Sequence, residues 1–198
     1  MTLNIITQPV IEPVSPANVE AHCRIDDLTS EQDTVELLIS SVRQRAESIT
    51  RRALITQTWE LVLNRFPFGR TSIELPLPPL QSITHIKYFD TNGVEQTLNS
   101  SLYRVIKNTS VPSEVMPVYG TEWPSTLDDS AVVTIRFVCG YGDSADKVPA
   151  AIIQWMLLNI ATLYENRETL VVGGKSIGMV DLKTIADGLL ENFRIYKL

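Results

Sequence analysis

Apolar and polar positions repeat with a helical period at both ends of the chain and with a period of two in the middle. The clearest helical stretch covers residues 29–54, where Thr29 and Gln32 are spaced as a capping box. Its apolar face carries Val35, Leu38, Ile39, Val42, Ala46, Ile49 and Ala53. A short helix is expected before it, because Ser15 and Pro16 form a favourable N-cap and first helical position. We expect the residues through Glu12 to be extended.

Between residues 56 and 142 the pattern is typical of short strands. "TQTWELVLNRF" alternates, "SLYRVIK" and "SAVVTIRFVCGYG" are rich in β-formers, and Thr91–Gly93 is a hairpin turn signal. The stretch that contains Pro76, Pro78 and Pro79 can only be an edge strand or a connection between strands, because proline cannot donate a hydrogen bond to a neighbouring strand. The sequence predicts an antiparallel β unit here.

A helix is predicted at 149–168, with a shorter amphipathic one within 180–198. The first is apolar around most of its circumference, so it must be buried on more than one side, either in one core or against a second subunit. Its apolar residues are Ile152, Ile153, Trp155, Met156, Leu157, Leu158, Ile160, Ala161 and Leu163. The predicted fold is α+β: about four helices formed by 1–55 and 143–198, with 56–142 inserted as a small antiparallel β unit.

Composition narrows the possible functions. The chain has 198 residues, 44% of them hydrophobic and 20% charged, as in a globular domain with a substantial core. A net charge of −6 argues against gripping nucleic acid over the whole surface, although DNA could pass such a surface without sticking. No apolar run reaches the roughly 18 residues that span a bilayer. Cys23 and Cys139 are expected to be reduced thiols.

Several motifs resemble sites for chemistry but lack the necessary context. "GGKS" at 173–176 ends like a phosphate-binding loop, yet Thr169 stands where that loop needs glycine, so a mobile loop is the better interpretation. "GYGDSA" at 140–145 lacks a surrounding βαβ unit, which favours a glycine turn leading into a helix. His22 and His85 have no ligand-spaced neighbours. We therefore expect no cofactor and no metal.

Two polar clusters leave alternative functions open. The long helix carries arginines that form either a solvated face or a DNA-binding surface: Arg43, Arg45, Arg51 and Arg52. "LYENRE" at 163–168 offers Tyr164, Glu165, Arg167 and Glu168 to a small enzyme. Helical spacing instead continues the buried stripe through Tyr164 and Arg167 and turns Glu165 and Glu168 away from it.

The order of "RALITQTW", "LPLPPLQSI" and "LYENRE", with "VTIRFVCGYG" between the last two, resembles the phage head–tail connector (adaptor) proteins in their long form with a β-rich insertion. The resemblance spans nearly the whole chain. It implies a non-enzymatic virion protein that forms a ring under the portal, extends the DNA channel and docks tail components. The helices would make the ring, with the β insertion at its periphery.

The resemblance also implies partners and places. The chain would form a homo-oligomeric ring of about twelve copies, contacting the portal protein and a tail-side completion or stopper protein. DNA would pass through without sequence-specific binding, and no membrane is involved. The chain would reside in the virion and, during assembly, in the host cytoplasm. The residues expected to serve assembly are Trp155, Tyr164, Arg167, Gly173, Gly174, Lys175, Arg51 and Arg52.

Arg167 gives a first test. An arginine at the end of an apolar helix face can pack its stem and bind the last carbonyls. We expect Arg167→Ala to lower the melting temperature or the yield of rings in electron micrographs, with no catalytic defect. Unchanged melting and assembly would contradict this role.

Overall fold

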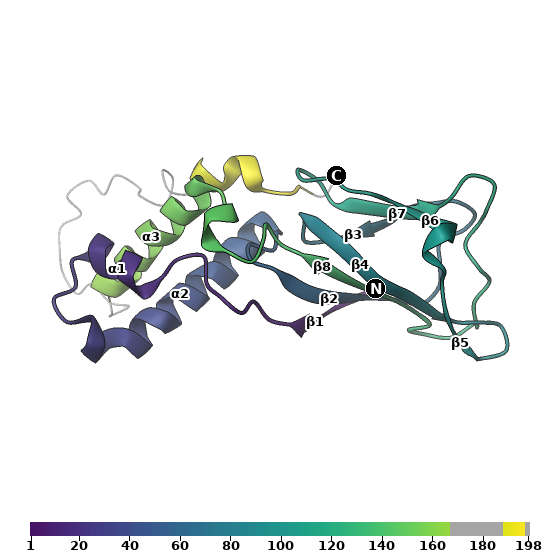
Figure 1. Ribbon diagram of the computed structural model, residues 1–198, viewed down its shortest axis with the longest axis horizontal. Coiled ribbons are helices and arrows are strands. Elements are labelled where there is room, and N and C mark those ends of the chain that lie inside the picture. Colours follow the sequence, from purple (N-terminus) through teal and green to yellow (C-terminus); the bar gives the residue numbers. More distant parts are fainter. Residues whose placement is uncertain (167–187, 197–198) are drawn as a thin grey trace, which may run out of the picture. The chain divides into compact units, whose positions relative to one another are not determined.

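The computed structural model describes residues 1–166 and 188–196, which form helices and antiparallel sheets, in agreement with the α+β prediction (Figure 1). The chain divides into two compact units. The strand unit comprises Met1–Val10 and Ile55–Tyr141, and the helical unit comprises Ile11–Leu54 and Gly142–Leu198. The first ten residues thus group with the strands, whereas the sequence had placed them with the helices.

The larger sheet of the strand unit has β8 at its centre. Its strands, all antiparallel to their neighbours, follow the order β1 (Thr2–Thr7), β2 (Gln57–Leu63), β8 (Val133–Cys139), β4 (Leu80–Phe89) and β5 (Glu95–Thr97). Alternate residues of β8 are buried, as the period of two predicts. On its other face Arg136 donates two hydrogen bonds to Glu60 of β2, at 3.1 and 2.7 Å.

A smaller sheet lies over the larger one (Figure 1). Its strand order is β3 (Ile73–Leu75), β7 (Ser113–Pro117) and β6 (Tyr103–Ile106). The short 3-10 helix η1 (Ser100–Leu102) leads directly into β6. Buried Val115 and Leu75 from this sheet and Ile86, Ile135 and Phe137 from the larger one supply the core of the unit. The sequence did not predict β7, a five-residue strand that ends in proline.

The predicted hairpin and proline connection are confirmed. β4 and β5 are joined through Asp90–Val94, where the Asp90 carboxylate accepts the N–H groups of Asn92 and Val94 and Gly93 has φ +77°. The three prolines lie between β3 and β4, where no ladder hydrogen bond is required of them.

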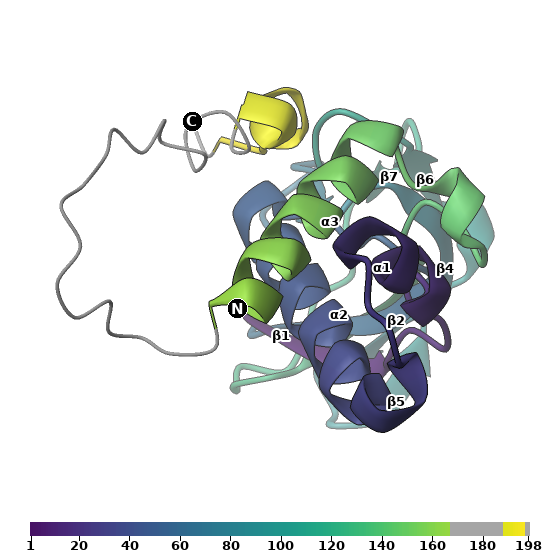
Figure 2. The same cartoon turned by 90° about the vertical axis from the view of Figure 1, so that its left-hand side faces the viewer.

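The helical unit contains α1 (Pro16–Cys23), α2 (Leu28–Thr50) and α3 (Ala150–Glu165). The short 3-10 helix η2 (Ala145–Lys147) precedes α3, and a second one, η3 (Glu191–Phe193), lies near the C-terminus. Figure 2 shows α2 and α3 side by side with α1 beside them, and α1 contacts both. None of the helices in the described ranges has the length and apolarity to cross a membrane.

The capping box predicted at Thr29 and Gln32 is wrong. Asp27 caps α2 instead, accepting the N–H groups of Thr29 at 3.1 Å and Ser30 at 3.4 Å. A carboxylate two residues earlier is a good N-cap acceptor and also suits the helix dipole. The box forms in α1, where Ser15 and Asn18 exchange hydrogen bonds.

Gly140 gives a test of the strand unit. Its φ is +118°, and an added Cβ would lie 2.4 Å from the carbonyl oxygen of Ile55. Gly140→Ala should lower the free energy of unfolding by about 3 kcal/mol or more, since backbone strain alone costs about 1–3 kcal/mol, measured by urea denaturation. Gly93→Ala is the matched control, because Gly93 also has positive φ but open space around it. Equal losses in both variants would contradict the close-contact account.

Candidate functional site

Trp155 lies in the core of its own unit. Its side chain is 1% exposed, and with Ile152, Met156 and Ile160 it forms the single buried stripe of α3. A side chain so enclosed cannot itself contact a second subunit, so its contribution to any assembly is to fix the helix. The opposite flank of α3 is half-buried, and Leu163 is 46% exposed. Within the described residues, α3 is therefore covered more fully on one side.

The end of α3 is polar but does not resemble a catalytic site. Tyr164 is half-buried, Glu165 is exposed, and the Asn166 side chain donates to the Thr162 carbonyl at 2.8 Å. Burial, and then the Glu165 carboxylate, raise the pKa of the nearby Cys23 thiol, which favours the unreactive protonated form. Four residues with predicted roles lie outside the described residues: Arg167, Gly173, Gly174 and Lys175, as does Glu168 of the enzyme hypothesis.

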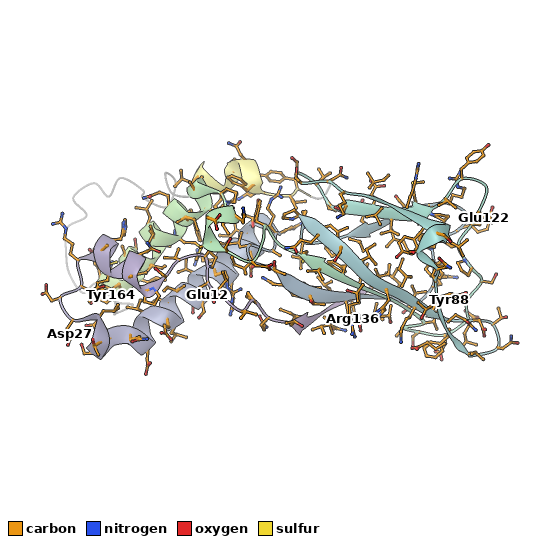
Figure 3. The ribbon with its side chains drawn as sticks, in the orientation of Figure 1. Glu12, Asp27, Tyr88, Glu122, Arg136 and Tyr164 are labelled. Atoms are coloured by element: carbon orange, nitrogen blue, oxygen red, sulfur yellow. The ribbon has the colours of Figure 1, made fainter. Side chains whose placement is uncertain are left out.

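Arg43 is buried, so the prediction of a wholly solvated or DNA-binding arginine face is wrong. Its Nε donates to Glu12 at 2.7 Å and its Nη1 to Glu47 at 2.8 Å, and its side chain is 6% exposed. The other carboxylate oxygen of Glu47 accepts the N–H of Leu54 at 2.9 Å. This cluster of Glu12, Arg43, Glu47 and Leu54, here the Arg43 cluster, joins three separate stretches of chain (Glu12 is labelled in Figure 3).

Arg52 is buried as well. Its Nε donates to the carbonyl oxygen of Phe193 at 2.6 Å, and the Ile195 N–H donates to the Thr50 carbonyl at 3.2 Å. These two bonds fasten the end of η3 and the residues after it to the end of α2. Of the four arginines, Arg45 and Arg51 remain exposed, and Arg51 is the left-handed C-cap of α2 with φ +57°.

The two histidines lie in different units and have different surroundings. His22 is exposed at the end of α1. Partial burial, then the cations of Arg136 and Lys87, lower the pKa of His85, which favours the neutral ring. Among the described residues no group of three or more histidines, cysteines or carboxylates could hold a metal ion. Neither cysteine forms a disulfide.

A shallow groove runs along α2 beside the segment that precedes α1. Its volume is about 720 Å³, its apolar lining includes Ile11, Val14 and Leu37, and its polar lining includes Glu12, Asp33 and Glu36. Leu37 is 66% exposed in this setting. We call this surface the acidic groove.

No protein-family model matches the sequence, and no curated protein matches it. Solved structures do match along the whole chain. A chain in the neck of an empty gene transfer agent particle, computed with C6 symmetry, has a TM-score of 0.80 and 22% identity. A chain in the virion of the native gene transfer agent particle has a TM-score of 0.80 and 21% identity. A chain in the neck of the native particle, computed with C12 symmetry, has a TM-score of 0.70 and 21% identity.

Each match covers 100% of this chain and 97% of the other. The likeness therefore includes both the strand unit and the helical unit. At such identities it establishes a shared fold.

The Arg43 cluster makes a stability prediction. Arg43→Met leaves two partly buried carboxylates without their cation, which should lower the free energy of unfolding by about 3–5 kcal/mol. Arg45→Met, at an exposed position of the same helix, should change it by less than about 0.5 kcal/mol. Urea denaturation measures both. Similar losses in the two variants would mean that the cluster does not stabilise the unit.

Proposed function

We propose that this chain is a structural protein of the neck of a phage-like particle, a head–tail connector that forms a ring below the portal. The observation that carries the proposal is the fold shared over the full length with chains from the necks of gene transfer agent particles. The likeness covers 100% of this chain, so it includes both the strand unit and the helical unit.

In this proposal the ring extends the DNA channel and docks tail components. The symmetries used for the neighbouring necks, C6 and C12, are compatible with a ring of about twelve copies. The portal protein and a tail-side completion or stopper protein are the proposed neighbours. The net charge of −6 suits a wall past which DNA slides, since an attractive wall would hold the duplex through many phosphate contacts.

The roles of the two units follow from their surfaces. We assign the body of the ring to the helical unit, whose exposed Leu37, Arg45 and Arg51 offer apolar and charged contacts to neighbouring copies, and the outer part of the ring to the strand unit. Tyr164, Arg167 and the 173–175 segment stay proposed assembly residues. Trp155 and Arg52 act through the packing of their own unit. The chain resides in the virion and, before assembly, in the host cytoplasm.

The two alternatives have weaker support. An enzyme using Glu165 would need partners around a carboxylate that is exposed. A DNA-binding module would need more exposed cations on α2 than Arg45 and Arg51, because Arg43 and Arg52 are engaged inside the unit.

Deletion of the gene from its particle-producing genome tests the proposal. Electron micrographs should then show heads and tails that are not joined, and the wild-type gene supplied in trans should restore joined particles. A Glu165→Gln/Glu168→Gln gene should restore them equally, because no catalysis is involved. Joined particles without the gene would contradict a neck function, and failure of the double variant, if folded, would favour the enzyme.

A further inference from the structure

Two loops of the strand unit expose aromatic rings almost completely. Phe68 is 96% exposed and Tyr119 is 93% exposed. They belong to the loops at residues 64–72 and 117–123, which we call the aromatic tip. Burying a ring of this size contributes about 1.5–3 kcal/mol, so the fold gives up this stabilisation twice.

The aromatic tip is built on a packed base. Phe66 stacks on Trp123 with ring centroids 4.8 Å apart, and Tyr88 meets Phe66 edge-on at 5.5 Å. The indole N–H of Trp123 donates to the Thr71 carbonyl oxygen at 2.8 Å, and the backbone N–H of Trp123 donates to the Gly69 carbonyl oxygen at 3.3 Å. The two loops are therefore tied to each other, and the exposed rings are held outward by the fold.

Arginines accompany the rings. The Arg70 guanidinium lies 5.4 Å from the centre of the Tyr119 ring and reaches the Pro117 carbonyl, while Arg65 is exposed beside a groove that Phe68 also lines. The two loops contain two arginines and one carboxylate, Glu122 (labelled in Figure 3). Aromatic residues and arginine are enriched at the hot spots of protein–protein interfaces.

This composition fits a protein surface better than a nucleic acid. Stacking platforms for single strands combine aromatic rings with a basic groove that tracks many phosphates. The strand unit has eight acidic and six basic residues, and Arg70 is already engaged with Tyr119. The complementary surface is therefore apolar and bordered by carboxylates.

The chain itself carries such a surface. The acidic groove offers the exposed side chains of Ile11 and Leu37 to an aromatic ring, and Asp33 and Glu36 to an arginine. A closed ring needs two different and complementary patches on every copy, because each contact between neighbours is heterologous. We propose that the aromatic tip of one copy docks in the acidic groove of the next copy, an inference that rests on the proposed ring.

Cysteine crosslinking tests this contact in the full chain, in a Cys23→Ser background. One copy carries Phe68→Cys and the other Leu37→Cys, and the two are expressed together in the particle-producing genome. Mild oxidation of purified particles should give a covalent dimer only when both cysteines are present. A chain carrying both cysteines should give a ladder of multimers. Val94→Cys, at an exposed hairpin position, replaces Phe68→Cys as the control and should give neither.

Charge reversal gives the second arm of the test. Arg65→Glu and Asp33→Arg should each lower the crosslink yield about tenfold, and together should restore most of it, because like charges repel and the swap re-forms an attractive pair. Failure of the swap to recover any of the yield would contradict the assigned pairing.

The outcomes separate this contact from the proposed function. Particles that contain the chain but give no 68–37 crosslink, or crosslink residue 68 to another protein or to a second residue 68, overturn the docking proposal and leave the neck function standing. If the chain is absent from particles, the neck function fails. Oxidation of the purified chain then decides the contact, with a ladder supporting it and its absence overturning it.

Discussion

The helical unit depends on one buried cation. The Arg43 side chain is only 6% exposed, so its charge must be matched inside the protein, and Glu12 and Glu47 match it at 2.7 and 2.8 Å. Because Glu47 also accepts the Leu54 N–H, one ionic cluster fixes the chain on both sides of α2. Glu12 and Leu54 each lie within two residues of a position where the chain passes between the two units.

A second buried arginine of this unit, Arg52, also has its polar group satisfied inside the protein. Arg52 donates to a backbone carbonyl, that of Phe193, rather than to a carboxylate, and so holds the end of η3 against the end of α2. In the strand unit, Gly140 lets two stretches of backbone approach closely, and its N–H donates to the Pro79 carbonyl oxygen. Neither position is at a site of chemistry. Arg43 and Arg52, which at first suggest a DNA-binding surface, are instead engaged inside the fold.

Local patterns in the sequence were sufficient for most elements and insufficient for long-range pairing. The Ser15 cap, the β4–β5 hairpin and the alternation in β8 are set by neighbouring residues, and all were predictable. The burial of Arg43 was not, because one of its two partners, Glu12, is 31 residues away. β7 was missed because a short strand ending in proline has little pattern of its own. The aromatic tip was missed for a related reason: exposure of Phe68 and Tyr119 depends on how two distant loops meet.

The central claim is that this chain forms a layer of the neck between head and tail. A cryo-electron microscopy reconstruction of the neck in intact particles from the source genome tests it most directly. We expect a ring-shaped layer below the portal into which both the helical and the strand unit fit, with side-chain density matching the stacked Phe66 and Trp123. A neck whose density is fully explained by other chains would contradict the account.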